Sequence, residues 1–242
     1  MNPTEDAALA FRLAEDAGRL LMTARAQTLV TGKALGDLGD VLAHQFLMRA
    51  LGVHRPDDAV LSEEGARDPE RLSRSRVWIV DPLDGTREYA EGRSDWAVHV
   101  ALTVDGRAIL GAVAQPGLGH CYRSDQPCDR LASGGLKIMV SRTRPPEAAE
   151  RAARTLGAEL VPMGSAGAKT MAVVRGEADA YIHAGGQYEW DSAAPVAVAE
   201  GAGLHASRLD GSPLIYNRED PYLPDLVVCR RDLAEQVLAA VR

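Results

Sequence analysis

The segment WIVDPLDGTREYAEG, residues 78–92, constrains the fold most, because it carries an apolar run directly into two aspartates. The run predicts a buried strand that ends at Asp81, and Asp84 follows shortly after it. A buried carboxylate is costly unless it is paired or coordinates a metal ion. Pro82 fixes the turn and has no N–H donor, so both carboxylates and the Leu83 carbonyl can converge on one point. Oxygen ligands of this kind suit a hard cation such as Mg²⁺.

The residues after these aspartates predict a phosphate site. Gly85 and Thr86 begin a short expected helix, and the free N–H groups at a helix N-terminus bind phosphate. A cation site and a phosphate site would then be neighbours, which suits phosphoryl chemistry. The spacing alone leaves one alternative open, an aspartate-rich turn in which Asp84 caps the helix.

Further acids follow other expected elements. The stretch LSEEG places Glu63 and Glu64 at the end of a short strand, and YEWDSAAP places Asp191 at the head of a helix. Each is weak evidence by itself, because acidic pairs usually lie on the surface and acids are favoured at helix starts. Together they add carboxylates to the predicted metal site.

Composition excludes several other functions. The chain has 242 residues, with 27 basic against 34 acidic side chains, which argues against a binder of polymeric nucleic acid. A small anionic substrate remains compatible, since a metal ion can reverse the local field. No apolar run approaches the ~18 residues of a membrane span, and the acidic N-terminus is unlike a signal peptide. Cys121, Cys128 and Cys229 form no CxxC pair, which predicts a reduced, cytoplasmic protein without a zinc site.

The first half of the chain predicts two helices on an antiparallel sheet. The helices are expected over residues 4–28, with Thr4 as N-cap, and from Asp40 to residue 51. A glycine-punctuated loop is expected between them, over residues 32–39. The apolar runs at 58–62, 76–81, 96–104, 108–116 and 119–124 predict strands, several of them joined by turns such as Asp105-Gly106.

From about Lys137 the pattern changes to alternating strands and helices, which indicates an α/β layer arrangement. Strands are expected at 137–141, 158–164, 179–185, 204–209 and 225–230, and helices at 145–157, 165–176, 191–203 and 231–242. We place the boundary in the loop 124–135. The division is an N-terminal α+β metal-binding half, 1–130, and a C-terminal α/β substrate-selectivity half, 131–242, with a site in the cleft between them.

Three motifs, LSEE, WIVDPLDGT and WDSAAP, occur in an order that resembles the inositol monophosphatase superfamily. These are Mg²⁺-dependent, lithium-sensitive phosphatases that include fructose-1,6-bisphosphatases and 3'(2'),5'-bisphosphate nucleotidases. The resemblance implies a layered αβαβα sandwich of the sugar-phosphatase type. It also allows a homodimer.

The resemblance implies two or three Mg²⁺ ions and a role for each motif residue. The implied metal ligands are Glu63, Asp81, the Leu83 carbonyl, Asp84 and Asp191. Thr86 would orient the attacking water, and Asp40 would partner Thr86 and help hold a third Mg²⁺. The residues before Asp40, Gly36-Asp37-Leu38-Gly39, depart from the Val-Thr-x-Ala pattern of the family. Asp37 therefore competes with Asp40 for that role.

The stretch GSAGAK, residues 164–169, resembles the Gly-Ser-x-x-x-Lys of the bisphosphate nucleotidases. There the serine and lysine contact the nucleotide, so the resemblance assigns Ser165 and Lys169 to the substrate. The alternatives are a helix N-cap for Ser165 and an exposed helix lysine for Lys169. Ala184 stands where inositol monophosphatases have a glutamate that binds the inositol hydroxyls, although Glu189 could substitute.

We therefore predict Mg²⁺-dependent hydrolysis of the 3'-phosphate of 3'-phosphoadenosine 5'-phosphate to AMP, in the branch linked to sulfate assimilation. The alternatives are inositol monophosphatase or fructose-1,6-bisphosphatase activity, and a non-catalytic metal or phosphate sensor. The predicted substrate-binding residues are Glu63, Leu83, Asp84, Gly85, Thr86, Ser165, Lys169 and Asp191.

Aromatic and histidine residues contribute less to the prediction. Tyr188 and Trp190 could stack on adenine, with core packing as the alternative for Trp190. The histidines at 99, 120, 183 and 205 have no metal-binding spacing, which predicts no role for them in the site.

Overall fold

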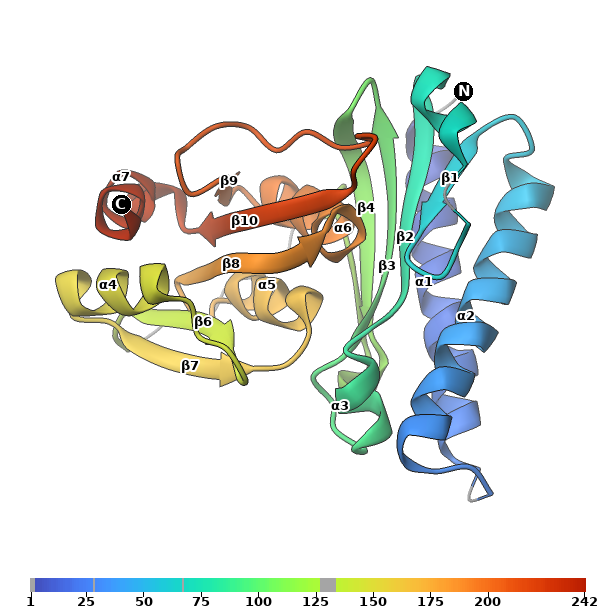
Figure 1. Cartoon of the computed structure of the whole chain (residues 1–242), viewed down its shortest axis with the longest axis horizontal. Helices are drawn as coiled ribbons and strands as arrows, with labels where there is room; N and C mark the ends of the chain where they lie inside the picture. The colour runs from blue at the N-terminus through green and yellow to red at the C-terminus, as the bar shows by residue number, and fades with distance from the viewer. Residues whose placement is uncertain (1–2, 28, 67, 127–133) are drawn as a thin grey trace.

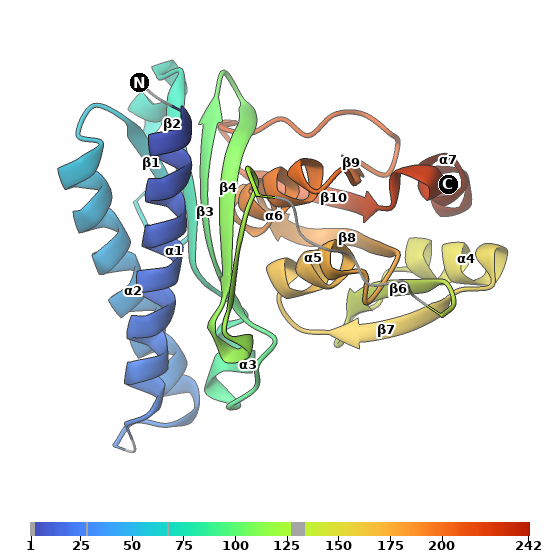
Figure 2. The same ribbon diagram turned by 180° about the vertical axis from the view of Figure 1, so that it is seen from behind.

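The computed structural model describes residues 3–27, 29–66, 68–126 and 134–242. Within these residues, ten strands form two five-stranded sheets, and helices lie outside and between them (Figures 1 and 2). The result is a five-layer α/β sandwich, as the resemblance implies.

The first sheet has the order β1-β2-β3-β4-β5. Its strands are β1 (Ala59–Ser62), β2 (Arg76–Asp84), β3 (Ala97–Val104), β4 (Arg107–Gln115) and β5 (His120–Arg123). Strands β2 to β5 form the predicted antiparallel meander. The expectation of a wholly antiparallel sheet is wrong, because β1 pairs parallel with β2. Parallel pairing brings the ends of β1 and β2 to one edge, where Glu63 N donates to Val80 O at 3.4 Å.

Helices α1 (Pro3–Arg25) and α2 (Gly32–His54) cover the outer face of this sheet. The first helix begins one residue before Thr4, which is therefore not its N-cap, and the predicted end at Thr28 lies outside the described residues. The predicted loop over 32–39 is wrong, and so is the predicted helix start at Asp40, because α2 already begins at Gly32. The glycines of this segment serve close packing: a Cβ on Gly36 would lie 2.8 Å from Thr86 Cγ2.

The second sheet has the order β7-β6-β8-β10-β9 and mixes parallel and antiparallel pairs. Its strands are β6 (Lys137–Ser141), β7 (Glu159–Met163), β8 (Ala180–Tyr188), β9 (His205–Ser207) and β10 (Tyr222–Cys229). Helices α4 (Glu147–Leu156) and α7 (Ala234–Val241) pack together on its outer side (Figure 1). The predicted alternation of strands and helices in this half is confirmed.

The middle layer consists of α5 (Ala166–Arg175) and α6 (Glu189–Gly201), between the two sheets. Helix α6 contacts β2, β3 and β4 of the first sheet and β8, β9 and β10 of the second. Both halves therefore share one central core, in addition to the cores under α1–α2 and under α4–α7. The division at residue 130 falls within 127–133, outside the described residues, and stays a prediction.

The remaining elements are short. Helix α3 (Thr86–Ala90) follows the aspartate motif as predicted, with Gly85 in the left-handed region at φ 91°. The 3₁₀ helices are η1 (Pro69–Ser73), η2 (Pro116–Leu118) and η3 (Arg231–Leu233). Within the described residues, none of the helices combines the length and apolar character that a membrane crossing requires.

Candidate metal centre and active site

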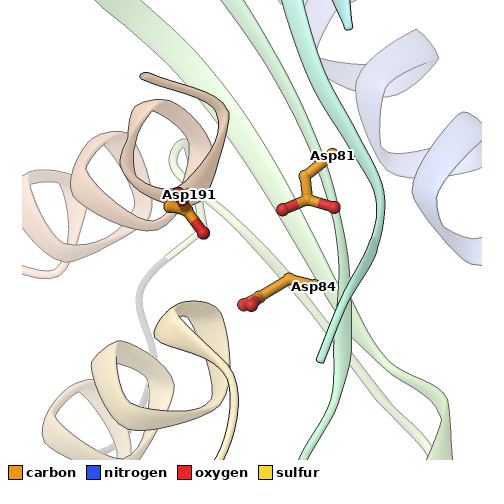
Figure 3. Close-up of side chains that lie close together, drawn as sticks. All are labelled: Asp81, Asp84 and Asp191. Carbon is orange, nitrogen blue, oxygen red and sulfur yellow. The ribbon is translucent and has the colours of Figure 1, made fainter. Parts of the chain in front are cut away.

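Three aspartates, two buried and one partly buried, meet at the end of β2. Asp81 pairs with His99 of β3 and Asp84 pairs with Ala97, so one extra residue of β2 bulges out between them. Side chains three residues apart on a regular strand point to opposite faces, and the bulge brings these two to the same face. Asp191 enters from the first turn of α6 (Figure 3). One carboxylate oxygen of each aspartate lies within 4.8 Å of the others.

Crowding leaves these carboxyl groups in need of positive charge. Burial, followed by the charges of Glu63 and Asp84, raises the pKa of Asp81 well above its ordinary value. Burial and the charge of Asp84 raise the pKa of Asp191 to about 7. Glu63 is an exposed residue next to this cluster, and desolvation of its carboxyl group with the charge of Asp191 raises its pKa to about 8. An all-oxygen, anionic donor set of this kind fits a divalent cation of the Mg²⁺ type.

Asp84 differs from its neighbours because protein donors surround it. Ser165 Oγ donates to Asp84 Oδ2 at 2.5 Å, Gly167 N donates to the same oxygen at 2.7 Å, and Ala166 N donates to Oδ1 at 3.1 Å. Burial alone would raise the pKa of Asp84, but the contact with His99 and its charge, together with Lys169 and Ser165, lower it to about 2. Asp84 therefore stays ionised while the others compete for protons.

Thr86 lies beside the cluster with a carboxylate behind it. Its Oγ1 is 3.1 Å from Asp40 Oδ1 and 3.2 Å from the Leu83 carbonyl oxygen. Burial raises the pKa of Asp40 to about 6 despite the hydrogen bond from Thr86. Asp37 instead accepts from Lys33 Nζ at 2.6 and 2.8 Å on the exposed side of α2. The geometry thus pairs Thr86 with Asp40.

The start of α5 forms the opposite wall. Ser165 Oγ accepts a hydrogen bond from Ala168 N at 2.9 Å. Ser165 is therefore the N-cap of α5, which was the alternative to a substrate contact. The alternative of an exposed helix lysine is wrong for Lys169, because the residue is only 5% exposed. Its Nζ donates to Ser165 O at 2.5 Å and Gly164 O at 3.2 Å, and lies 5.2 Å from the centre of the Tyr181 ring. Burial lowers the pKa of Lys169, and this effect outweighs the negative charge of Asp84, which raises it.

A cavity of about 260 Å³ separates these walls. It is lined by Asp84, Gly85, Ser165, Lys169, Gln187 and Asp191, among others. Among the described residues the buried Gln187 Oε1 has no hydrogen-bond partner, and Gln187 Nε2 donates to Tyr181 Oη at 2.8 Å. Polar groups at this wall are therefore available to a bound molecule.

The residues considered for inositol or adenine recognition are otherwise engaged. Glu189 is buried, and its carboxylate accepts from Asn217 N at 2.6 Å and Arg218 N at 2.8 Å, so it is not free to replace a residue at Ala184. Trp190 is buried in the central core and stacks on Tyr188, with ring centres 4.9 Å apart. The core-packing alternative for Trp190 is confirmed.

The residue that sequence reasoning missed is His99. It is fully buried, with Nε2 at 3.2 Å from Asp84 Oδ2 and Nδ1 at 3.0 Å from the Trp190 carbonyl oxygen. Strand alternation contained a signal, because Val98 and Val100 pack in the core under α1 and α2. His99 must then point to the other face, towards the aspartates.

A comparison with protein families gives a match over residues 2–242 to the inositol monophosphatase family. The chain belongs to this family. It is 53% identical to the 3'-phosphoadenosine 5'-phosphate phosphatase of Mycobacterium leprae, over 98% of this chain and 93% of that protein. It is 30% identical to the 3'(2'),5'-bisphosphate nucleotidase CysQ of Escherichia coli K12, over 76% of this chain and 80% of that protein. The resemblance drawn from the three motifs is thus confirmed.

Solved structures agree with this assignment. CysQ from Bacteroides thetaiotaomicron, a bacterial member of the inositol monophosphatase family, superposes with a TM-score of 0.81 at 25% identity, covering 94% of this chain and 97% of that one. An inositol monophosphatase from Zymomonas mobilis gives a TM-score of 0.80 at 23% identity, over 100% of this chain and 99% of that one, which supports the fold alone. The family is one of metal-dependent phosphatases, and the acidic cluster is where this chain can bind a metal ion.

Proposed function

We propose that this chain is a Mg²⁺-dependent phosphatase that hydrolyses the 3'-phosphate of 3'-phosphoadenosine 5'-phosphate, giving AMP and inorganic phosphate. The observation that carries the chemistry is the three-aspartate cluster with the Thr86–Asp40 pair beside it; Asp84 and Asp191 of this cluster line an open polar cavity. The choice of substrate is supported by the names of the relatives at 53% and 30% identity.

The residues proposed to hold Mg²⁺ are Glu63, Asp81, the Leu83 carbonyl, Asp84 and Asp191. When bound, Mg²⁺ would supply a Lewis acid and positive charge for the phosphoryl oxygens. The raised pKa values of Asp81, Asp191 and Glu63 support this role, since a cation would replace the protons that crowding now favours.

Thr86 and Asp40 are proposed to handle the water. The Thr86 hydroxyl donates its proton to Asp40, and its oxygen can accept a hydrogen bond from a water molecule placed for in-line attack. With a pKa of about 6, Asp40 is mainly ionised at neutral pH and can take a proton through Thr86. No cysteine or serine nucleophile is required for this route.

Substrate selectivity is proposed to come from the C-terminal wall. Lys169 is the buried cation there, and it would meet phosphate or ribose oxygens that enter the cavity. The proposed substrate contacts are Glu63, Leu83, Asp84, Gly85, Thr86, Ser165, Lys169 and Asp191. Lithium sensitivity, a link to sulfate assimilation and a homodimer are further parts of the proposal that rest on the resemblance. A cytoplasmic location is also proposed, from the sparse cysteines of the sequence, which form no CxxC pair.

Phosphate release from three substrates in Mg²⁺ buffer tests the proposal: 3'-phosphoadenosine 5'-phosphate, inositol 1-phosphate and fructose 1,6-bisphosphate. We expect kcat/KM for the nucleotide to exceed the others at least tenfold, about 1.4 kcal/mol in transition-state free energy. A preference for inositol phosphate would overturn the substrate assignment, and no release from any of the three would favour the non-catalytic sensor.

A further inference from the structure

The buried ring of His99 lies between the two elements that carry Asp84 and Asp191. Its Nδ1 lies 3.0 Å from the Trp190 carbonyl oxygen, and a carbonyl can only accept, so Nδ1 carries a proton. Its Nε2 lies 3.2 Å from Asp84 Oδ2. Trp190 immediately precedes Asp191. One imidazole therefore spans the bulge of β2 and the first turn of α6, the two elements that carry the cluster.

The packing around His99 explains a glycine in α5. A Cβ on Gly167 would lie 2.0 Å from His99 Nε2, closer than any real contact allows. Glycine in a helix costs about 1 kcal/mol relative to alanine. Gly167 N also donates to Asp84 Oδ2 at 2.7 Å. The glycine thus lets α5 approach closely enough for its backbone to bond the carboxylate oxygen that the imidazole contacts; Nε2 itself makes no hydrogen bond within the described residues.

We propose that His99 is a positioning residue for the cation site, which limits the movement of Asp84 by packing against its Oδ2 and positions Asp191 through the hydrogen bond to the Trp190 carbonyl, and that Gly167 provides the space it needs. The inference rests on the proposed function, since it concerns the same cluster. A positioning role differs from a core-packing role because it affects the geometry of the metal ligands and not only the stability of the fold. The lone pairs of Asp84 that remain free are aimed by His99 and α5, so their direction depends on this ring.

Titration of the purified chain with Mn²⁺, followed by the electron paramagnetic resonance of free Mn²⁺, tests the proposal without substrate. We expect His99→Ala to weaken Mn²⁺ binding at one or more sites by about ten- to a hundredfold, the range for groups that orient metal ligands. His99→Gln retains an N–H donor on a side chain of similar reach and should recover part of that loss. Gly167→Ala should weaken binding in the same way, because it displaces the ring.

His205→Ala is the matched control, because His205 is a partly buried histidine on β9 that contacts Ser207 Oγ at 2.9 Å, away from the cluster. It should bind Mn²⁺ as the unchanged chain does. A folded His99→Ala that also binds as the unchanged chain does would overturn the proposal. Should His99→Ala not fold, unchanged binding by a folded Gly167→Ala would overturn it.

Turnover gives a second readout. A positioning defect should be relieved by excess Mg²⁺, so the activity of His99→Ala should rise with Mg²⁺ concentration well beyond the point where the unchanged chain saturates. A loss of packing alone would lower activity at every Mg²⁺ concentration. If the unchanged chain binds no Mn²⁺, the proposed function itself fails; if it binds and His99→Ala binds equally well, only this inference fails.

Discussion

Asp84 of β2 and Lys169 of α5 line the same cavity, yet the carboxylates of the cluster and the lysine are stabilised in opposite ways. Asp81 is buried among other acids and receives one backbone hydrogen bond, from Leu83 N at 3.1 Å. Lys169 is equally buried, yet two backbone carbonyls and an aromatic ring surround its ammonium group. One wall needs a cation from solution to be complete, whereas the chain itself completes the other.

This difference suggests that the carboxylates serve the reaction and that the lysine serves the choice of substrate. The carboxylate wall places charge where the fold cannot balance it, a pattern typical of functional sites. The lysine wall is satisfied before anything binds, so it can favour one substrate over another without being needed for the reaction. Changes in the first wall should then affect every substrate, and changes in the second should depend on the substrate.

The largest effect should come from the carboxylate wall. Asp81→Asn and Asp84→Asn should each lower kcat/KM by at least about 1000-fold, about 4 kcal/mol, with all substrates. Their stabilities without metal should move in opposite directions. Asp81→Asn removes a carboxylate whose pKa is raised by burial, and should raise Tm at pH 7. Asp84→Asn removes one whose pKa is lowered to about 2 by its donors, and should lower the free energy of unfolding by roughly 2 kcal/mol.

Differential scanning calorimetry in EDTA and phosphate release in Mg²⁺ check this pair. The Asp84 contribution is present above pH 4 and lost as pH falls through about 2, so the Tm difference should shrink in acid. Substantial turnover by either variant would contradict the assignment of the cluster to the reaction.

Asp40→Asn should lower kcat by about 10²- to 10³-fold and remove a pH effect. Asp40 is useful when ionised, and burial raises its pKa to about 6, so the activity of the unchanged chain should rise as pH passes through about 6. The variant should lack that rise. Asp37→Asn is the control, because Asp37 is exposed and paired with Lys33. A pH profile unaltered by Asp40→Asn would remove this residue from proton transfer.

Lys169→Ala should test the second wall. We expect kcat/KM for 3'-phosphoadenosine 5'-phosphate to fall about tenfold to a hundredfold, with little change for inositol 1-phosphate. Because two buried carbonyls lose their donor, the free energy of unfolding should also fall by about 1–3 kcal/mol. Lys137→Ala, on β6, serves as the control for loss of a lysine. Equal losses with both substrates would show that this wall does not discriminate.

The stabilisation of the chain by Mg²⁺ should be an effect of about the size expected for Lys169→Ala. At one hundred times its dissociation constant a ligand adds about 2.7 kcal/mol, which is roughly 5–10 °C in Tm for a chain of this size. The raised pKa values of Asp191, about 7, and Glu63, about 8, mean that the metal-free chain loses stability as pH rises through that range. The Mg²⁺-induced shift in Tm should therefore be larger at pH 8.5 than at pH 5.5, and an equal shift would argue against binding at these acids.

Most of this site could be predicted because its motifs are local. The strand that carries both aspartates is a run of nine consecutive residues, Arg76–Asp84, although it continues past Asp81, where the sequence predicted a turn. The bulge that turns Asp84 to the same face was not visible, since it depends on pairing with β3. His99 was missed for the same reason: its partners come from other elements, Asp84 on the neighbouring strand β2 and Trp190 in α6, 91 residues away. The burial of Lys169 likewise depends on the second sheet.

The start of α2 was mispredicted because glycine has two uses that a sequence does not distinguish. Gly36 and Gly39 were interpreted as turn residues, yet both lie inside the helix, against Thr86 and Leu83. The parallel pairing of β1 was similarly hidden, because strand direction depends on the crossover between β1 and β2 and not on either strand. Local sequence patterns thus predicted most helices and strands, whereas contacts between distant elements determine where these begin and end and how the strands pair.

The same two glycines bear on any effort to make this protein more heat-resistant. Replacing a helix glycine with alanine is a standard stabilising change, with an expected gain of up to about 1 kcal/mol. Here an added methyl would lie 2.8 Å from Thr86 Cγ2 at Gly36 and 2.9 Å from Leu83 Cδ2 at Gly39. Either change would push α2 outward and carry Asp40 away from Thr86. Selection for thermal tolerance and selection for turnover would therefore oppose each other on this one turn of helix.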